Sequence, residues 1–227
     1  MSRILVVAAH PDDEILGAGG TLARHVAQSD EVFALILGEG QTSRWSSRES
    51  SDKQAVEELR KDTLAAAEVI GFSKTWSADL PDNRFDTVAL LDIVKCVEKY
   101  TALIRPEIVY THHAEDLNID HRITFEAVLT AARPIGDYSV KEIYAFETVS
   151  STEWNYGSRS KSFCPNVFVD IEAFFERKCE AMKEYKSELC RFPHPRSLEM
   201  LDAAARRWGA TVGKTYAEAF ELIRKVI

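Results

Sequence analysis

The chain has 227 residues, of which 45% are hydrophobic and 28% charged, and its formal net charge is −8. This profile is typical of a globular protein, and we predict one domain over residues 1–227. The acidic balance and the lack of a basic patch argue against nucleic acid as a partner. No apolar run approaches the ~18 residues of a membrane span, and the N-terminal apolar run lacks a signal-peptide cleavage site.

The four cysteines are isolated in the sequence and form no C-x-x-C pair: Cys96, Cys164, Cys179 and Cys190. This spacing argues against a disulfide framework and against a thiolate zinc site. We therefore expect a cytoplasmic protein with free thiols. A symmetric homo-oligomer is common among enzymes of this kind and size.

Apolar runs and amphipathic segments alternate along the first two thirds of the chain. The periodicity predicts, in chain order, strand 2–9, helix 15–28, strand 32–37, helix 54–70, strand 73–76, helix 88–104, strand 108–111, helix 122–132 and strand 140–148. The last third departs from this alternation, with a predicted strand at 166–169 and helices at 171–188 and 198–207. Residues 216–223 are compatible with either a helix or a strand.

This alternation predicts an α/β, Rossmann-like fold with a mostly parallel sheet and helices on both faces. In such sheets, ligands bind beyond the carboxyl ends of the strands. The glycines Gly17, Gly19 and Gly20 match no nucleotide-binding loop, and we expect them to allow close packing of a helix on the sheet. The polar stretch 38–52 is longer than a plain connection needs, and loops of this length are often functional.

Two polar segments directly follow predicted strands, and they hold four of the six histidines of the chain. The first is the run from His10 to Glu14, HPDDE, and the second is the run from His112 to His121, HHAEDLNIDH. Each could simply begin a helix, with Asp120 as the N-cap of the second. Because parallel strand ends converge, however, the two segments together supply histidine and carboxylate ligands for a catalytic metal with an open position for water.

The same segments resemble the LmbE-like, or PIG-L, family of zinc-dependent N-deacetylases. AHPDDEILGAGGTLARH matches the strand-end signature of that family, and THHAEDLNIDHRITFEAV matches its D-x-x-x-D-H element. Weaker similarity covers Gly38-Glu39 with Thr42 and Arg44, the run LPDNR at 80–84, and the run PHPRS at 193–197.

The resemblance implies that His10, Asp13 and His121 ligate one Zn²⁺ per chain, although such ligands also suit iron or cobalt. Asp12 is implied as the general base that takes a proton from the attacking water. We expect Asp120 to orient an imidazole and fix its tautomer.

One position departs from the family pattern. Many members carry histidine where this chain has Asn118, and an amide can donate a hydrogen bond to an oxyanion but cannot deliver a proton. The general acid is therefore unassigned: Asp12 could return the proton, or His194 or His113 could serve. We expect His112 to be a packed strand-end residue and His25 to be structural.

Three further residues are candidate contacts for the substrate. Arg44 could bind a phosphate or carboxylate through its guanidinium fork, and Asp82 and Asn83 could bind sugar hydroxyls, although PDN is also a plain turn signal. The sequence thus predicts a metal-dependent hydrolase that removes an N-acyl group, acetyl by resemblance, from a small-molecule amino sugar or sugar conjugate. The alternatives are an amidase or esterase acting on another acyl substrate, and a metal-binding homologue without catalysis.

Overall fold

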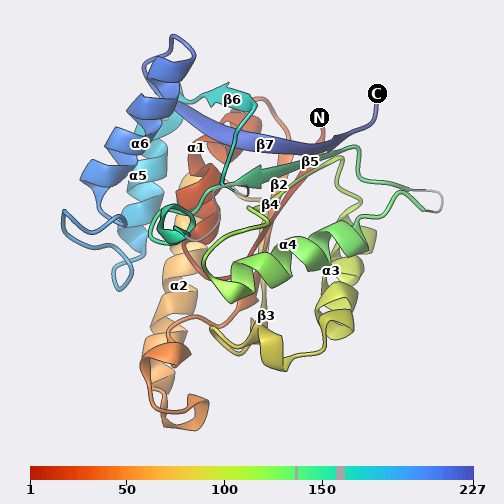
Figure 1. The fold of residues 1–227 in the computed structure, drawn as a ribbon, viewed down its shortest axis with the longest axis vertical. Helices are drawn as coiled ribbons and strands as arrows, with labels where there is room; N and C mark the ends of the chain where they lie inside the picture. Colours follow the sequence, from red (N-terminus) through yellow and green to blue (C-terminus); the bar gives the residue numbers. More distant parts are fainter. Residues whose placement is uncertain (136–137, 157–161) are drawn as a thin grey trace.

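The computed structural model describes residues 1–135, 138–156 and 162–227 (Figure 1). The strands are β1 (Arg3–Ala8), β2 (Glu31–Gly38), β3 (Lys74–Leu80), β4 (Ile108–His112), β5 (Glu142–Phe146), β6 (Val167–Asp170) and β7 (Ala217–Lys225). The helices are α1 (Asp13–Ala27), α2 (Lys53–Ile70), α3 (Leu90–Ile104), α4 (Ile119–Ala131), α5 (Phe175–Glu184) and α6 (Leu198–Thr211). Among these residues, no helix is both long and apolar enough to cross a lipid bilayer.

The strands form one seven-stranded sheet in the order β3-β2-β1-β4-β5-β7-β6. The strands from β3 to β5 pair in parallel, and β7 pairs antiparallel with both β5 and β6. The order reverses direction between β1 and β4, which are neighbours with Ile4 opposite Ile108. In open α/β sheets this switch point is where a ligand crevice forms, so the fold places the crevice beyond His10 and His112.

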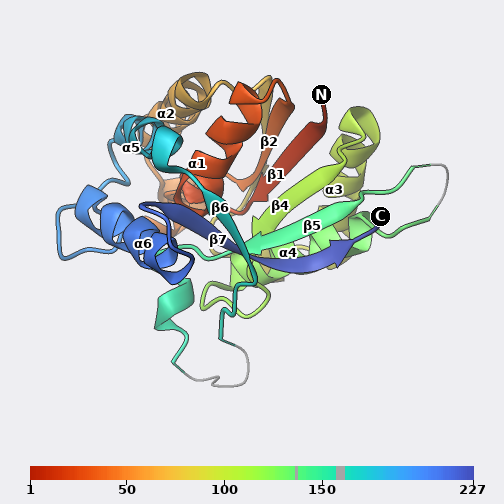
Figure 2. The same ribbon diagram turned by 90° about the horizontal axis from the view of Figure 1, so that it is seen from above.

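Helices cover both faces of the sheet, as Figure 2 shows from above. One hydrophobic cluster joins the sheet to α1, α2, α5 and α6, and it includes Ile15, Leu22 and Tyr185. A second cluster joins the other face to α3 and α4, and it includes Val97 and Val128. The buried apolar runs of β1 and β2 pack into both clusters, which explains why these strands read as continuous hydrophobic segments.

The predicted fold class is confirmed, and the main differences lie at element ends. Strand β3 continues to Leu80 rather than ending at residue 76, and α5 is shorter than the predicted helix 171–188. The ambiguous segment 216–223 is a strand from Ala217 onward: it belongs to β7, in which the buried Phe220 pairs with Phe146 on β5 and with Val167 on β6. Helix α4 begins at Ile119 rather than Arg122, and this shift matters for the site below.

Close packing of α1 on the sheet depends on glycine, as the sequence predicts. A β-carbon at Gly17 would overlap the ring of Phe146 on β5, and one at Gly20 would lie 2.8 Å from Ile171. Neither position has room for a side chain unless the helix or these two neighbouring side chains move. Because α1 begins with the HPDDE turn, this packing fixes where His10 and Asp13 sit relative to β4.

Candidate metal site and the cavity around it

The candidate metal site lies at the switch point between β1 and β4. His10 and Asp13 belong to the turn that leads from β1 into α1, on one face of the sheet. His121 lies in the first turn of α4, which the chain enters after β4 and which packs on the other face. Two crossovers in opposite directions therefore bring these three side chains to one point.

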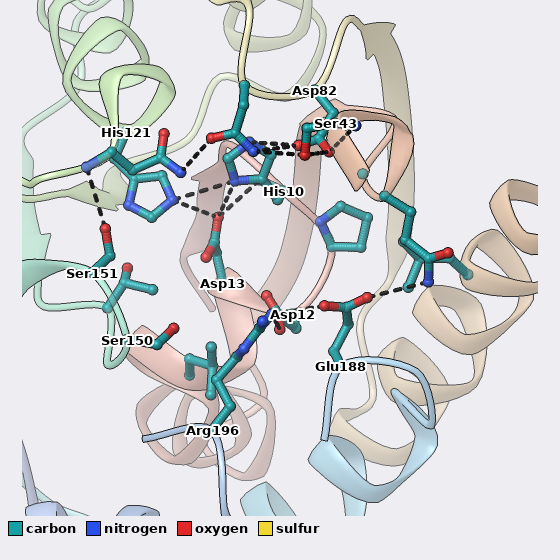
Figure 3. A pocket seen from close by; sticks show the side chains of 18 of the residues that line it. His10, Asp12, Asp13, Ser43, Asp82, His121, Ser150, Ser151, Glu188 and Arg196 are labelled. Atoms are coloured by element: carbon teal, nitrogen blue, oxygen red, sulfur yellow. Dashed lines mark hydrogen bonds and ion pairs between the residues drawn. The ribbon is translucent and has the colours of Figure 1, made fainter. Parts of the chain in front are cut away.

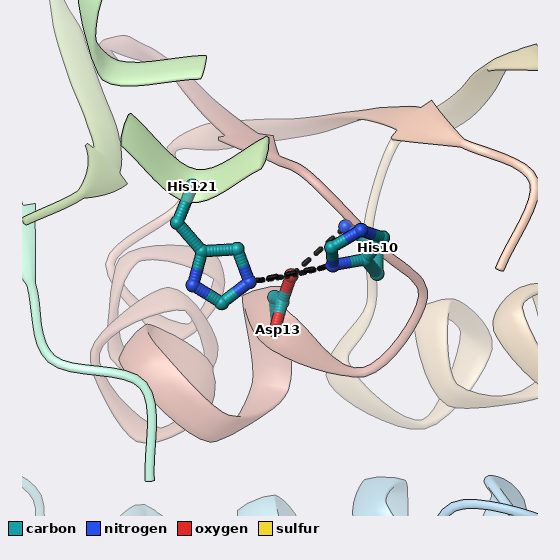
Figure 4. A group of neighbouring side chains, drawn as sticks. All are labelled: His10, Asp13 and His121. Atoms are coloured by element: carbon teal, nitrogen blue, oxygen red, sulfur yellow. Dashed lines mark hydrogen bonds and ion pairs between the residues drawn. The ribbon is translucent and has the colours of Figure 1, made fainter. Parts of the chain in front are cut away.

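The ligating atoms of His10, Asp13 and His121 form an equilateral triangle (Figure 4). The distances are 3.3 Å from His10 Nδ1 to Asp13 Oδ2, 3.3 Å from His121 Nε2 to the same oxygen, and 3.3 Å between the two nitrogens. A tetrahedral zinc ion with ligand bonds of about 2.0–2.1 Å has edges of about 3.3–3.4 Å between its donors. The triangle therefore fits one face of a zinc coordination tetrahedron, with the fourth corner left for water.

Each imidazole has a carboxylate beside its other nitrogen. Asp120 Oδ2 lies 3.0 Å from His10 Nε2, and Asp120 Oδ1 accepts the backbone N–H of Phe85 at 2.9 Å. Asp116 Oδ1 lies 3.2 Å from His121 Nδ1, without the alignment of a hydrogen bond. A carboxylate in this position keeps the proton on the far nitrogen, so the lone pair faces the metal. The sequence predicts such a role for Asp120 but not the corresponding role of Asp116.

Asp116 is fully buried and is held by hydroxyl groups and by the backbone. It accepts hydrogen bonds from the hydroxyls of Ser151 and Thr152 and, at 2.8 Å, from the N–H of Asn118. Burial raises its pKa, but His121 and these hydroxyls outweigh burial and lower the pKa of Asp116 to about 2. The first aspartate of the D-x-x-x-D-H element was the sequence signal that could have identified it.

The charges of the cluster favour a bound cation. Burial alone would lower the pKa of His121, but Asp13 and Asp116 raise the pKa of His121 to about 9. Asp13 is a carboxylate whose pKa is lowered: burial works against ionisation, and the charge of His121, with the hydrogen bonds from His10 and His121, overcomes it. The negative charges around the two imidazoles thus favour a proton or a divalent metal there.

Asp12 lies beside the ligands without joining their triangle. Its backbone φ of 96° is left-handed, a strained conformation for a residue with a side chain, and its carboxylate does not cap α1. Burial, followed by the neighbouring charge of Asp13, raises the pKa of Asp12, and Arg196 partly opposes the rise. A carboxylate with a raised pKa is suited to accept and return a proton near neutral pH.

The consecutive histidines His112 and His113 point in opposite directions. His112 Nε2 accepts the backbone N–H of Ala9 at 2.8 Å, and burial followed by the charge of His121 lowers the pKa of His112 to about 3, which keeps it neutral. His113 Nδ1 instead lies 2.7 Å from Glu221 Oε2 on β7. The expectation of a packed His112 agrees with these contacts, whereas His113 does not line the cavity.

His194 and His25 also lie outside the cavity. His194 Nδ1 accepts the backbone N–H of Arg196 at 3.1 Å, so its ring supports a loop. His25 is placed between Asp30 and the hydroxyl of Tyr110, a structural arrangement as expected. A general-acid role for His113 or His194 would therefore require these side chains to move into the cavity.

Asn118, rather than Asp120, is the N-cap of α4. Its Oδ1 accepts the N–H of Asp120 at 2.8 Å, and this cap explains why the helix begins earlier than predicted and why His121 falls in its first turn. Asn118 Nδ2 donates one hydrogen bond to Asn83 Oδ1 at 3.0 Å. An amide nitrogen carries a second N–H, and because no described residue accepts it, this N–H can serve a ligand in the cavity.

The cavity beside the metal site has a volume of about 250 Å³ (Figure 3). The predicted residues Arg44, Asp82, Asn83 and Asn118 all line it. The metal side of this cavity is formed by His10, Asp13 and His121. The opposite wall, which we call the arginine side, is formed by Glu188 and Arg196, and Asp12 lies between the two sides (Figure 3). Arg44 lines the same cavity and belongs to the arginine side through its ion pair with Glu188.

The charged side chains of the arginine side contact one another in a row. Of these residues, the sequence predicts only Arg44 as part of the site. Glu188 is buried and accepts hydrogen bonds from Arg44 Nη2 at 2.6 Å and from Arg196 Nη1 at 2.7 Å. The same Arg196 nitrogen lies 3.3 Å from Asp12 Oδ2. The PHPRS motif contains Arg196, but the sequence offered no reason to choose the arginine over the histidine.

Backbone strain is concentrated around the cavity. In the described part of the chain, seven residues other than glycine have positive φ, and four of them line the cavity: Asp12, Gln41, Asn83 and Ser150. Strained conformations persist only where the surrounding structure enforces them, and they are often found at functional sites. The strain supports this cavity as the working site of the protein.

Comparison with known families and proteins agrees with the geometry. Residues 5–132 match the family described as PIG-L, GlcNAc-PI de-N-acetylase. The chain is 28% identical over 193 residues to the uncharacterized deacetylase YaiS of Escherichia coli, covering 81% of this chain and 90% of that protein. It is also 28% identical over 198 residues to the 4-oxalmesaconate hydratase of Pseudomonas putida, covering 79% and 71%.

A third relative is the diacetylchitobiose deacetylase of Thermococcus kodakarensis, 23% identical over 98% of this chain and 84% of that protein. Among solved structures, the conserved protein TT1542 of Thermus thermophilus superposes with a TM-score of 0.78 at 26% identity, covering 100% of this chain and 97% of that one. The similarity therefore includes the C-terminal third, which lies outside the family match.

Proposed function

The chain belongs to the PIG-L family of de-N-acetylases, and on that premise we propose that it is a zinc-dependent N-deacetylase that acts on an acetylated amino sugar or sugar conjugate. The observation that carries the proposal is the 3.3 Å triangle of His10, Asp13 and His121, with the buried carboxylate of Asp12 beside it. Three ligands, an open coordination position and a separate base are what amide hydrolysis on zinc requires.

Zinc, when bound, would acidify a water molecule and polarise the carbonyl of the amide. Asp12 takes the proton from the attacking water, because its carboxylate lines the cavity beside the triangle. The other nearby carboxylates, which belong to Asp82, Asp116 and Asp120, instead face the outer nitrogens of the two imidazoles. The carboxyl group of Asp12 then delivers that proton to the departing amine, because no histidine of the described cavity wall is free of the triangle. The free N–H of Asn118 Nδ2 would stabilise the developing negative charge on the carbonyl oxygen.

The lining of the cavity supports a hydroxyl-rich substrate. Ligand pockets are usually lined by apolar side chains, whereas this wall consists mainly of amide, hydroxyl and charged groups. The uncharged polar members are Gln41, Ser43, Asn83, Asn118, Thr148, Ser150 and Ser151. A sugar ring offers many hydroxyls to such groups, and the named activity of the diacetylchitobiose deacetylase relative is of this class.

The test is acetate release from a panel of N-acetylated amino sugars, their conjugates and nucleotide sugars, with metal content measured on the same sample. We expect release from at least one sugar, loss of release on chelation and recovery with added zinc. One bound metal per chain combined with no acetate from any substrate would contradict the proposal.

A second candidate function is hydration of a carbon–carbon double bond, favoured by the 28% identity to 4-oxalmesaconate hydratase. The same triangle and base could direct water to an alkene instead of an amide. Adding 4-oxalmesaconate to the substrate panel and following its absorbance separates the two reactions. Consumption of this compound without any acetate release from the sugars would favour the hydratase.

A further inference from the structure

The carboxylates of Asp12 and Asp13 are held in different ways. Asp13 Oδ2 accepts the backbone N–H of His10 at 2.8 Å and contacts both imidazoles of the triangle. The Asp12 side chain makes no capping hydrogen bond to α1. Among the described residues, the hydrogen bond recorded for this carboxylate comes from Arg196, whose Nη1 lies 3.3 Å from Oδ2. The orientation of the proposed base therefore depends on a residue 184 positions away in sequence.

Arg196 extends from a backbone that is fixed on both sides. It directly precedes Ser197, whose hydroxyl caps α6 by accepting the N–H of Met200 at 3.1 Å. The carbonyl of Arg196 accepts the N–H of Cys190 at 3.0 Å, and its own N–H donates to His194 Nδ1 at 3.1 Å. These contacts leave the loop little freedom, so the guanidinium reaches Asp12 from a defined origin.

Glu188 limits the number of contacts that the Arg196 guanidinium makes with Asp12. Arg196 Nη1 lies 2.7 Å from Glu188 Oε2 and 3.3 Å from Asp12 Oδ2, so one nitrogen is shared and the nearer carboxylate is Glu188. Arg44 binds Glu188 from the other side at 2.6 Å. A two-point pair between arginine and Asp12 would occupy both oxygens of the base. The single shared contact holds Oδ2 and leaves Oδ1, which has no recorded hydrogen bond among the described residues.

We infer that Arg196, held by Glu188, is a positioning residue: it fixes the Asp12 carboxylate through Oδ2 so that Oδ1 can accept the proton of the attacking water. The catalytic part of this inference rests on the proposed function, whereas the orientation of Asp12 does not. A base must be held within hydrogen-bond reach of the proton it takes, and a displacement of about 1 Å can cost about 100-fold in rate.

The first test is a double-mutant cycle with Arg196→Ala and Asp12→Asn, in which kcat, KM and metal content are measured. We expect Arg196→Ala to lower kcat about 100-fold with little change in KM and full metal content. In the Asp12→Asn background, the same change should cost less than about twofold, because Arg196 acts through Asp12. Guanidinium in the assay and the Arg196→Lys variant should each restore part of the rate.

The matched control is Arg206→Ala, because Arg206 on α6 makes an exposed ion pair with Asp202 and does not line the cavity. We expect this variant to keep the wild-type kcat. A rise in KM with unchanged kcat for Arg196→Ala would overturn the inference, since it would make Arg196 a substrate contact. If the effects of Arg196→Ala and Asp12→Asn on kcat are additive, the inference is also overturned, because Arg196 would then act independently of Asp12.

A second readout is independent of substrate: crystal structures of the metal-free wild type and of Arg196→Ala, or of Arg196→Lys should the alanine variant fail to fold. We expect the Asp12 carboxylate to rotate away from its wild-type position in the variant. An unchanged carboxylate would overturn the inference even if activity fell. A rotated carboxylate in a protein that releases no acetate from any sugar would contradict the proposed function and leave the positioning role standing.

Discussion

The metal side and the arginine side of the cavity differ in where their residues originate. His10, Asp13 and His121 follow strands β1 and β4 and lie at the first turns of α1 and α4. Arg44, Glu188 and Arg196 come instead from the loop after β2 and from the loop between α5 and α6. The metal side therefore depends on regular elements that the sheet aligns, and the arginine side depends on loops that ion pairs join to one another.

This difference in origin suggests different roles for the two sides, namely metal geometry for the metal side and substrate preference for the arginine side. Strand ends and helix starts place atoms reproducibly, which a metal triangle with 3.3 Å edges requires. Loops tolerate substitution and insertion, so the arginine side is where we expect substrate preference to be set. Asp12 touches both sides: its backbone belongs to the HPDDE turn, and its carboxylate contacts Arg196.

The largest expected effect is a difference between the asparagine variants of Asp12 and of its neighbour Asp13. We predict that Asp12→Asn lowers kcat by about 10²–10⁴-fold, the contribution of a positioned general base, while zinc stays bound. Asp13→Asn should instead release the metal, because it removes a corner of the triangle. Activity assays with metal analysis of both dialysed variants test this. Loss of zinc from Asp12→Asn would show that the roles of the two aspartates are exchanged.

Much of the metal side could be predicted from sequence, because its signals are local. An apolar strand followed by HPDDE and another followed by D-x-x-x-D-H suffice once the parallel sheet is inferred. The predicted start of α4 was wrong because Asn118, and not Asp120, is the N-cap of this helix. The opposite directions of His112 and His113 could have been expected, since successive residues at a strand end point to opposite faces.

The arginine side could not be predicted in the same way. The contact of Arg44 with Glu188 joins residues 144 positions apart, and that of Asp12 with Arg196 joins residues 184 positions apart. Neither pairing follows from periodicity or spacing, because both depend on how the loop after β2, the turn before α1 and the loop between α5 and α6 meet at the cavity. A buried glutamate shared by two arginines is a tertiary feature, and the sequence around Glu188 offers no sign that it is buried.

A smaller effect tests whether Asn118 belongs to the chemistry or only to the fold of the metal side. We predict that Asn118→Ala lowers kcat by at least roughly tenfold, the scale of a lost oxyanion donor, and also destabilises the protein by about 1 kcal/mol through loss of the cap. Asn118→Ser keeps a capping oxygen and removes the amide. It should lower kcat to a similar extent with a smaller fall in melting temperature. If both variants keep the wild-type kcat, Asn118 has no part in the mechanism.

The last prediction distinguishes the two sides by their dependence on pH in the metal-free protein. Arginines remain charged at every pH of interest. The contribution of the arginine side to stability should therefore change little with pH. The contribution of the metal side to stability should change with pH because of His121. The pKa of His121 is about 9 in the folded protein and about 6.5 in the unfolded chain. A raised folded pKa stabilises the fold fully below pH 6.5, and this stabilisation is lost as the pH rises through 9.

We therefore predict that the metal-free protein becomes less stable between pH 6.5 and pH 9, by on the order of 3 kcal/mol. Stoichiometric zinc should remove most of this decline, because the metal supplies the positive charge that the departing proton takes away. Denaturant unfolding at several pH values, with and without zinc, measures both curves. Asp116→Asn removes one of the carboxylates that raise the pKa of His121, so its metal-free decline should end at a lower pH and be smaller in total. A metal-free stability that rises across this window would show that His121 is not held by these carboxylates, and the account of the metal side would fail while that of the arginine side would not.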